Sequence, residues 1–270
     1  YGDPRDLPSF PPRRSSDLAI IHPGAQLHES VRVGPYSVID EHVTVGAGCE
    51  LGPHVHLTGH TTIGAENRFH TGCVIGDAPQ DLKYGGEPTR LIVGERNFFR
   101  EHVTVHRSNT PDEDTRIGSE NFFMANSHVG HNSIIGNKAI LSNGVLIAGH
   151  VMIGDGAFLA GNAVVHQFCR VGAMAMMQGC AGVSLDLPPF TIVRGINGMC
   201  GLNSVGLKRA GFSAEERSQL KKAYHAIFLS DDLLKDALEK ARAEFTGVLA
   251  EQLIDFVATS QRGTCSHTKR

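Results

Sequence analysis

The chain has 270 residues, 41% of them hydrophobic and 20% charged, so it can bury a core of its own and is not a disordered protein. Its formal net charge of −3 excludes the strongly basic footprint of a nucleic-acid-binding protein. No run of about 18 apolar residues occurs, which excludes a membrane span, and six cysteines without a CxxC pair favour reduced thiols in the cytoplasm. Residues 1–18 are rich in proline, arginine and serine and lack the apolar core of a secretory signal, so we expect a disordered or non-native segment.

The next feature along the chain is a six-residue repeat of large apolar side chains. It covers residues 21–75, 93–105 and 117–183, and all 25 of its positions are apolar where chance would supply about ten. Neither the helical period of 3.6 nor the strand period of two produces this spacing. The repeat predicts short strands joined by tight turns, three to a coil, which stack into a parallel β-helix.

Two segments interrupt the repeat, at about residues 77–91 and 107–116. Loops of this length project from a solenoid and commonly carry function. The first contains Gln80, Asp81 and Lys83, and a tyrosine follows directly, so an amide, an acid, a base and a phenol lie within five residues. Such groups can hydrogen-bond a sugar and neutralise a phosphate. A solvated charged loop is the alternative for this segment taken alone.

The C-terminal part has a helical pattern. Ser213 and Glu216 form a capping-box sequence that opens a helix through about Leu229, and further helices are expected from about residue 230 and over 248–260. The predicted organisation is an N-terminal segment of residues 1–18, a β-helix of residues 19–195, a helical domain of residues 196–263 and a tail of residues 264–270. The flat sides of a β-helix usually associate, so we expect a cyclic oligomer.

Four histidines are candidates for chemistry. With three hexads to a coil, His131, His150 and His166 fall on neighbouring coils along one edge, close to His128. Imidazole titrates near pH 6.5 and suits general-base catalysis. Three interpretations stay open at this point: a transferase with a histidine base, a zinc site of three histidines shared between subunits, and a structural solenoid with incidental histidines.

The chain carries four longer motifs: GDAPQDLKYGGEPTRL, SHVGHN, AVVHQFCRVG and GLNSVGLKRAGF. Together they resemble the acyl-carrier-protein–UDP-N-acetylglucosamine O-acyltransferase family, which performs the first step of lipid A biosynthesis. The likeness extends from about residue 21 to residue 254. It implies an all-β solenoid plus α, namely a left-handed parallel β-helix of hexapeptide repeats with a small C-terminal helical domain. The left hand and a homotrimer are implied by the resemblance alone.

The resemblance also implies a mechanism. His131 matches the family's base, which takes the proton from the 3-hydroxyl of the glucosamine ring while that oxygen attacks the acyl thioester. The Gly149 N–H would stabilise the oxyanion, and no acyl-enzyme, cofactor or metal is required. Acyl carrier protein would donate an (R)-3-hydroxyacyl chain to UDP-N-acetylglucosamine. The implied substrate-binding residues are Gln80, Asp81, Lys83, His128, His150, His166, Gln167, Asn203 and Arg209.

Several positions depart from the family pattern. An acid normally follows the base histidine, whereas Asn132 can orient the ring but adds no charge. Val205 and Ala210 stand where an acid and a second arginine often contact the nucleotide. Gly179 matches the position that measures acyl length, and its missing side chain favours a long chain, although a plain turn glycine is the alternative.

Related activities remain as alternatives. One alternative is the same acyl transfer to a 3-amino UDP-sugar, and another is a hexapeptide-repeat zinc carbonic anhydrase. A related N-acyltransferase also shares the repeat, but it carries an extra N-terminal domain that the short segment before the repeat cannot supply. Because the acyl carrier protein is acidic, we expect a basic patch that binds it. Its candidates are Arg170, Arg194, Lys208, Arg209, Lys221 and Lys222.

Overall fold

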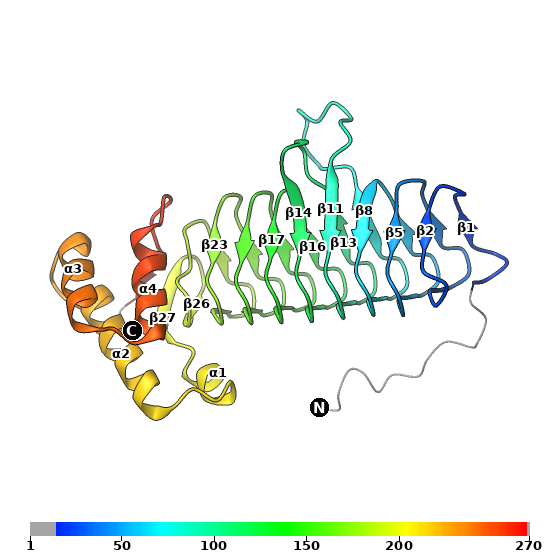
Figure 1. Ribbon diagram of the computed structural model, residues 1–270. Coiled ribbons are helices and arrows are strands. Elements are labelled where there is room, and N and C mark those ends of the chain that lie inside the picture. The colour runs from blue at the N-terminus through cyan, green and yellow to red at the C-terminus, as the bar shows by residue number, and fades with distance from the viewer. Residues whose placement is uncertain (1–14, 269–270) are drawn as a thin grey trace.

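The computed structural model describes residues 15–268, and most of the predicted N-terminal segment lies outside this range. The described chain forms a long prism of parallel strands, with helices packed at its C-terminal end (Figure 1). Ser15 pairs with Val33 of the first coils. Within residues 15–268 no helix has the length and apolar character needed to cross a bilayer.

Three sheets form the sides of the prism. The first, called the site sheet below, contains β1 (Ile20–Ile21), β4 (Val38–Ile39), β7 (His56–Leu57), β10 (Val74–Asp77), β13 (Thr104–His106), β16 (His128–Val129), β19 (Leu146–Ile147), β22 (Val164–Val165) and β25 (Gly182–Val183). The second contains β2 (Gln26–Leu27), β5 (Thr44–Val45), β8 (His60–Ile63), β11 (Arg90–Val93), β14 (Asp114–Ile117), β17 (Ile134–Ile135), β20 (Met152–Ile153) and β23 (Arg170–Val171).

The third sheet extends into the C-terminal part. It contains β3 (Arg32–Val33), β6 (Glu50–Leu51), β9 (Arg68–Phe69), β12 (Phe98–Phe99), β15 (Phe122–Phe123), β18 (Ile140–Leu141), β21 (Phe158–Leu159), β24 (Met176–Met177), β26 (Thr191–Arg194), β27 (Gly198–Leu202) and β28 (Ser266–His267). β27 runs antiparallel to β26, and β28 pairs with β27. A strand at the start of the predicted helical domain and a strand in the predicted tail therefore belong to this sheet.

The six-residue repeat forms the core, as the spacing predicts. The second residue of most two-residue strands is buried, and the rings of Phe69, Phe99 and Phe123 stack at 4.8 and 4.7 Å between centroids. Cys49 and Cys73 each stand four residues after a repeat position, where small side chains face the core. Both are fully buried and carry free thiols. Burial raises the pKa of the Cys73 thiol to about 12, so this thiol is core material rather than a nucleophile.

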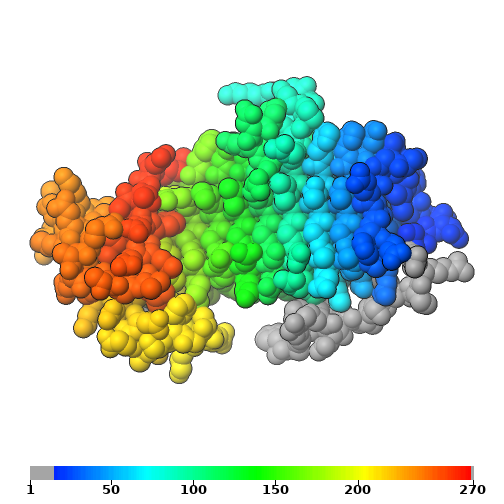
Figure 2. All heavy atoms as spheres, in the orientation of Figure 1, coloured from blue at the N-terminus to red at the C-terminus, as the bar shows by residue number. Residues whose placement is uncertain are grey.

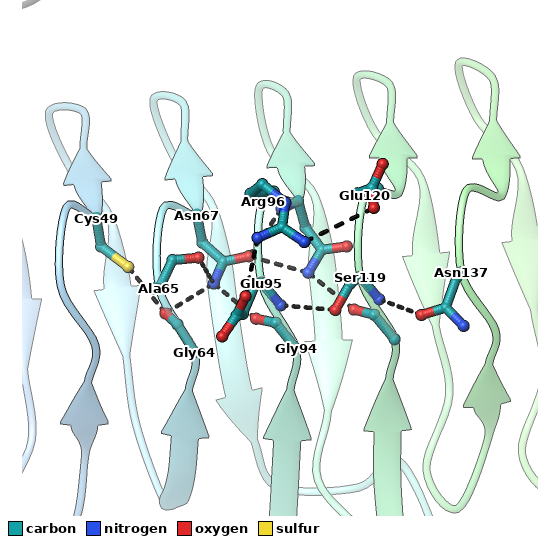
Figure 3. Close-up of polar contacts among 12 residues, drawn as sticks. Cys49, Gly64, Ala65, Asn67, Gly94, Glu95, Arg96, Ser119, Glu120 and Asn137 are labelled. Carbon is teal, nitrogen blue, oxygen red and sulfur yellow. Dashed lines mark hydrogen bonds and ion pairs between the residues drawn. The ribbon is translucent and has the colours of Figure 1, made fainter.

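Side chains at the coil corners also form vertical ladders. Asn67 donates to the carbonyls of Gly64 and Gly94, and its Oδ1 accepts from the backbone and side-chain amides of Asn97 (Figure 3). Asn97 in turn accepts from the backbone N–H of Asn121. These asparagines satisfy backbone groups that the tight turns leave unpaired.

The corners require unusual backbone conformations. Among residues 15–268, sixteen non-glycine residues have φ between 52° and 66°, in the left-handed region that L-residues rarely adopt. Asn132, His150 and Phe168 are three of them, each one coil beyond the last and therefore stacked at one corner.

The two predicted interruptions are loops at one edge of the prism. In a regular coil Ile20 pairs with Val38, but Val74 pairs with Thr104 and Arg90 pairs with Asp114. The first loop therefore adds twelve residues to its coil and the second adds six, and both stand out above the body (Figure 2). Strand pairing continues in phase beyond them.

In the described part of the chain four helices close the C-terminal end: α1 (Ser204–Arg209), α2 (Ala214–Phe228), α3 (Leu234–Glu244) and α4 (Val248–Ala258). The predicted capping box is present at the start of α2, with Ser213 and Glu216 each bonded to the other's backbone. The short helix α1 was not among the predicted elements. Its six residues are too few to show a hydrophobic period.

Candidate active site

A groove of about 920 Å³ runs along the outer face of the site sheet. Histidines line one part of it, and Leu146, Val164 and Ile196 expose apolar side chains in another. Six of the predicted residues line the groove: Gln80, His128, His131, Gly149, His166 and Gln167. Polar and apolar surfaces thus meet in one channel, which suits a substrate with a polar reacting group and an apolar tail.

His131 lies in the turn that follows β16. Gly149 stands one coil above it, and a Cβ at Gly149 would lie 2.6 Å from His131 Nε2. Only glycine therefore leaves room for the imidazole at this place. No hydrogen bond joins the Gly149 N–H to another residue in the described part of the chain, so this donor is available to a ligand.

The buried Asn132 determines which nitrogen of His131 carries the proton. Asn132 Oδ1 accepts from the backbone N–H of Asn109 at 3.0 Å, and its Nδ2 donates to Glu113 Oε2 at 2.7 Å. A backbone N–H only donates and a carboxylate only accepts, so the orientation of the amide is fixed. His131 Nδ1, at 2.8 Å from Asn132 Oδ1, must then be the donor. The lone pair is left on Nε2, as a general base needs.

His128 is held in the neutral form. Its Nδ1 lies 2.7 Å from the Thr104 hydroxyl, and its ring meets that of His106 edge to face at 4.7 Å. Burial lowers the pKa of His128 to about 4, and the neighbouring charges of His106 and His131 act in the same direction. Burial also lowers the pKa of His106. At neutral pH His128 therefore offers a hydrogen bond rather than a charge.

The prediction that His131, His150 and His166 follow one edge holds for the first pair only. The rings of His131 and His150 are 5.2 Å apart and nearly perpendicular. His150 then stacks on Phe168 at 4.7 Å, because these two residues lie one coil apart. His166 instead lies in line with Ala148, exposed to solvent. Burial lowers the pKa of His150, and so does the charge of His131.

The two loops meet above the groove. Asp81 accepts from the Lys83 backbone at 3.0 Å and from the Asn109 side chain at 2.7 Å, and these bonds, the first above all, lower the pKa of its carboxyl. Arg107 donates to the Tyr84 hydroxyl at 3.1 Å and to a backbone carbonyl at the base of the loop. The Lys83 side chain is exposed. The loop that carries Asp81 and Lys83 is thus fastened to the loop that touches Asn132.

Other predicted residues lie away from the groove. Asn203 caps α1, with its Oδ1 accepting from Gly206 N–H at 3.0 Å and its Nδ2 donating to Met174 O at 2.9 Å. Arg209 lines a second hollow of about 620 Å³ with Lys208 and Arg217. Gly179 is exposed at a corner, where an added Cβ would meet only a carbonyl oxygen at 3.6 Å.

One member of the predicted basic patch is already engaged. Arg170 forms an ion pair with Asp186 at 2.8 Å, donates to Phe256 O at 2.9 Å and lies over the Phe256 ring. This arginine fastens α4 to the end of the β-helix. Lys208 and Arg209 remain as candidates near the second hollow.

Sequence reasoning missed several residues around His131, among them Thr104, His106, Asn109 and Glu113. Thr104 pairs with His128 across a coil lengthened by a loop, so the regular coil spacing did not align them. The loop residues obey no period at all. Phe168 could have been found, since it lies one coil beyond His150. Within residues 15–268 no three His, Cys, Asp or Glu side chains are grouped as metal ligands.

Comparisons with known proteins identify the family. A model described as UDP-N-acetylglucosamine O-acyltransferase, domain 2, matches residues 186–265, and a bacterial transferase hexapeptide model matches residues 24–59 and 114–149. The acyl-[acyl-carrier-protein]–UDP-N-acetylglucosamine O-acyltransferases of Myxococcus xanthus and Herminiimonas arsenicoxydans are 44% and 46% identical, each over 91% of this chain and 96% of its own length.

Solved structures give the same result. LpxA from Acinetobacter baumannii has a TM-score of 0.90 at 37% identity, covering 93% of this chain and 99% of its own. The UDP-N-acetylglucosamine acyltransferase of Francisella novicida has a TM-score of 0.90 at 35% identity, covering 94% of this chain and 95% of its own. The predicted left-handed parallel β-helix with a small helical part is confirmed. The chain is an acyltransferase and belongs to the acyl-[acyl-carrier-protein]–UDP-N-acetylglucosamine O-acyltransferase family.

Proposed function

We propose that the protein transfers an (R)-3-hydroxyacyl chain from acyl carrier protein to the 3-hydroxyl of UDP-N-acetylglucosamine, the first step of lipid A biosynthesis, with His131 as general base. The observation that carries this proposal is the fixed tautomer of His131, whose Nδ1 donates to Asn132 and whose Nε2 lies beside Gly149, a residue whose N–H has no hydrogen-bond partner among residues 15–268. A base and an oxyanion donor thus lie side by side in the groove.

The reaction follows from these two groups. His131 Nε2 takes the proton of the sugar 3-hydroxyl as its oxygen bonds to the thioester carbonyl carbon. The negative charge on the carbonyl oxygen is stabilised by the Gly149 N–H. When the tetrahedral intermediate collapses, the carbon–sulfur bond breaks and the thiolate of the carrier receives the proton from His131. Neither a covalent acyl-enzyme nor a cofactor is needed.

Substrate groups are assigned by chemistry. His128, Gln80, Asp81 and Lys83 hold the sugar nucleotide beside the base, with His150, His166 and Gln167 completing the polar part of the groove. The apolar part along β19 and β22 takes the acyl chain. In the second hollow Arg209 attracts phosphate, and Lys208 beside it attracts the acidic carrier protein.

We further propose a homotrimer that acts in the cytoplasm. The flat sheets expose large apolar side chains such as Ile134 and Met152, at 40% and 48%, which an assembly would cover. In such an assembly Asn203 and Arg209 serve the nucleotide from the helical end. All six cysteines are free thiols, which agrees with a reducing compartment.

The test is acyl transfer from a panel of 3-hydroxyacyl carrier proteins to UDP-N-acetylglucosamine, comparing wild type with His131→Ala. We expect transfer by the wild type and a loss of at least about 1,000-fold in the variant, in the range of a lost general base. Transfer that survives in His131→Ala would disprove the role of this residue. Transfer only to a 3-amino sugar would correct the acceptor.

The same panel tests acyl length. Because Gly179 offers no side chain to shorten the binding space, we expect long 3-hydroxyacyl donors to react best. A Gly179→Met variant should shift the preference to shorter donors. Efficient wild-type use of ten-carbon donors alone would contradict this assignment.

A further inference from the structure

The loop between β13 and β14 places a carboxylate against the amide that holds His131. Glu113 Oε2 lies 2.7 Å from Asn132 Nδ2, and Asn132 Oδ1 lies 2.8 Å from His131 Nδ1. A hydrogen-bonded chain therefore runs from carboxylate to amide to imidazole. We infer that Glu113 is a positioning residue, which acts through the Asn132 amide to hold His131 in its base tautomer and to stabilise its protonated form. The inference rests on the proposed role of His131 as the base.

The chain of hydrogen bonds explains how a neutral amide can serve beside the base. Asparagine alone orients an imidazole but brings no charge to stabilise the imidazolium. A carboxylate on the far side polarises the amide, because hydrogen bonds in series strengthen one another. Ser108 Oγ, at 2.9 Å from the same Nδ2, and Asn109 N–H hold the amide in place. The negative charge thus stands one hydrogen bond further from the imidazole than a directly bonded acid would.

The surroundings determine the size of the effect. The Glu113 side chain is 59% exposed, so salt and water screen its charge. Four other titratable groups interact with His131 and stay in place when Glu113 is changed, namely Asp81, His106, His128 and His150. Glu113 also lies 3.7 Å from His150 Nδ1. An experiment must therefore separate an effect on His131 from one on His150.

Four variants make the separation. Glu113→Gln removes the charge, and Asp112→Asn makes the same charge change one residue away, where no contact with Asn132 or His131 is found among residues 15–268. Asn132→Asp with Glu113→Gln moves the acid next to His131 and can keep a hydrogen bond between the two positions. Asn132→Asp alone sets two carboxylates against each other.

The first readout is the pH–rate profile of acyl transfer. In Glu113→Gln we expect kcat to fall about threefold and the midpoint of the acid limb to move down by about half a pH unit, since the imidazolium loses a partly screened negative charge. The difference should shrink at high salt. Asp112→Asn should match the wild type, and the double variant should recover the wild-type kcat.

The second readout does not require activity. Histidine labelled with ¹³C reports the tautomer and titration midpoint of each imidazole, and the His131 resonance is assigned by its absence in His131→Ala. Glu113→Gln should lower that midpoint and increase the minor tautomer. An unchanged His131 titration and kcat would overturn the inference, as would a loss confined to KM and to the His150 resonance. If the labelled protein behaves as expected but no donor is used, the proposed function fails while the link between Glu113 and His131 stands.

Discussion

At the scale of single residues, the place of the His131 ring depends on a neighbouring residue that carries no side chain. Gly149 stacks on His131 because the two residues occupy equivalent places in successive coils. The imidazole of His131 fills the space that a Cβ at position 149 would need. This relation could have been calculated from the repeat once His131 was singled out. The orientation of the Asn132 amide could not, since it depends on a backbone N–H from a loop that has no period.

Gly149→Ala should therefore damage catalysis more than folding. The new Cβ would meet Nε2 at 2.6 Å and Cε1 at 2.7 Å, so the ring must move, and a displacement of about 1 Å can reduce rates about 100-fold. We expect kcat to fall by roughly that factor with a small change in melting temperature. Gly161→Ala is the matched control, because its Cβ would meet only a carbonyl oxygen at 3.6 Å. Equal kcat values for the two variants would contradict the steric account.

His128 should make the stability of the fold depend on pH. Its pKa is about 4 in the folded chain and near 6.5 when unfolded, so the unfolded state takes up this proton first as the pH falls. The free energy of unfolding should therefore be unaffected above pH 7 and decrease between about pH 6.5 and 4, by roughly 2–3 kcal/mol in all. Urea unfolding at a series of pH values checks this.

His128→Gln supplies the control for that titration, because glutamine takes up no proton in this range. The variant should lose stability less steeply than wild type below pH 6.5 and run parallel to it above pH 7. Identical slopes in the acid range would show that His128 does not contribute. The buried His106 acts in the same direction and should leave a residual slope in the variant.

At the scale of elements, the short strands follow from the repeat, while the corners need specific side chains. Asn67 lies one coil beyond Cys49 and Asn97 lies two coils beyond it, so the repeat fixes their places although the sequence analysis did not single them out. What it did not show is that an amide there bonds to the coils on both sides (Figure 3). The breaks in the repeat likewise located the two loops. They did not show how the loops contact each other, because no period constrains the loop residues.

Asn97→Ala should be costly to stability. The change removes the acceptor of the Asn121 N–H and the donor to Gly118 O inside a fully buried ladder. Leaving such groups unpaired costs about 2–4 kcal/mol, whereas an exposed ladder residue such as Asn137 should cost less than about 1 kcal/mol when changed to alanine. Chemical unfolding of the two variants measures the difference. Comparable losses would mean that the ladder adds nothing beyond local turn preference.

At the scale of the whole molecule, one ion pair joins the β-helix to the helical end. Asp186 is buried and accepts from the Arg170 side chain at 2.8 Å and from Ser260 at 2.8 Å, while Arg170 reaches α4. Arg170 was predicted to serve a carrier protein at the surface. Sequence reasoning could not assign it inward, because its partners lie 16 and 86 residues away.

Arg170→Leu should loosen the helices without disturbing the groove. Removing one partner of a buried pair leaves Asp186 uncompensated, at a cost of about 3–5 kcal/mol. We expect faster hydrogen exchange in α4 and unchanged exchange in β16 and β19. Arg242→Leu, which breaks an exposed pair with Asp255, is the control and should leave α4 protected. Uniform loosening of the whole chain would contradict a local role.

The residues with positive φ at the coil corners affect how the protein folds. Each such residue is strained by about 1 kcal/mol within its own coil, and in most of them the backbone N–H bonds to a carbonyl of the preceding coil. We therefore expect a single coil to be unstable by itself, and folding to begin with a slow nucleation step after which neighbouring coils add rapidly. Asn132 and His150 lie on neighbouring coils well inside the stack. A fragment that ends at their coils would contain His131 and the Asn132 amide but not the following coils that help to hold them in place.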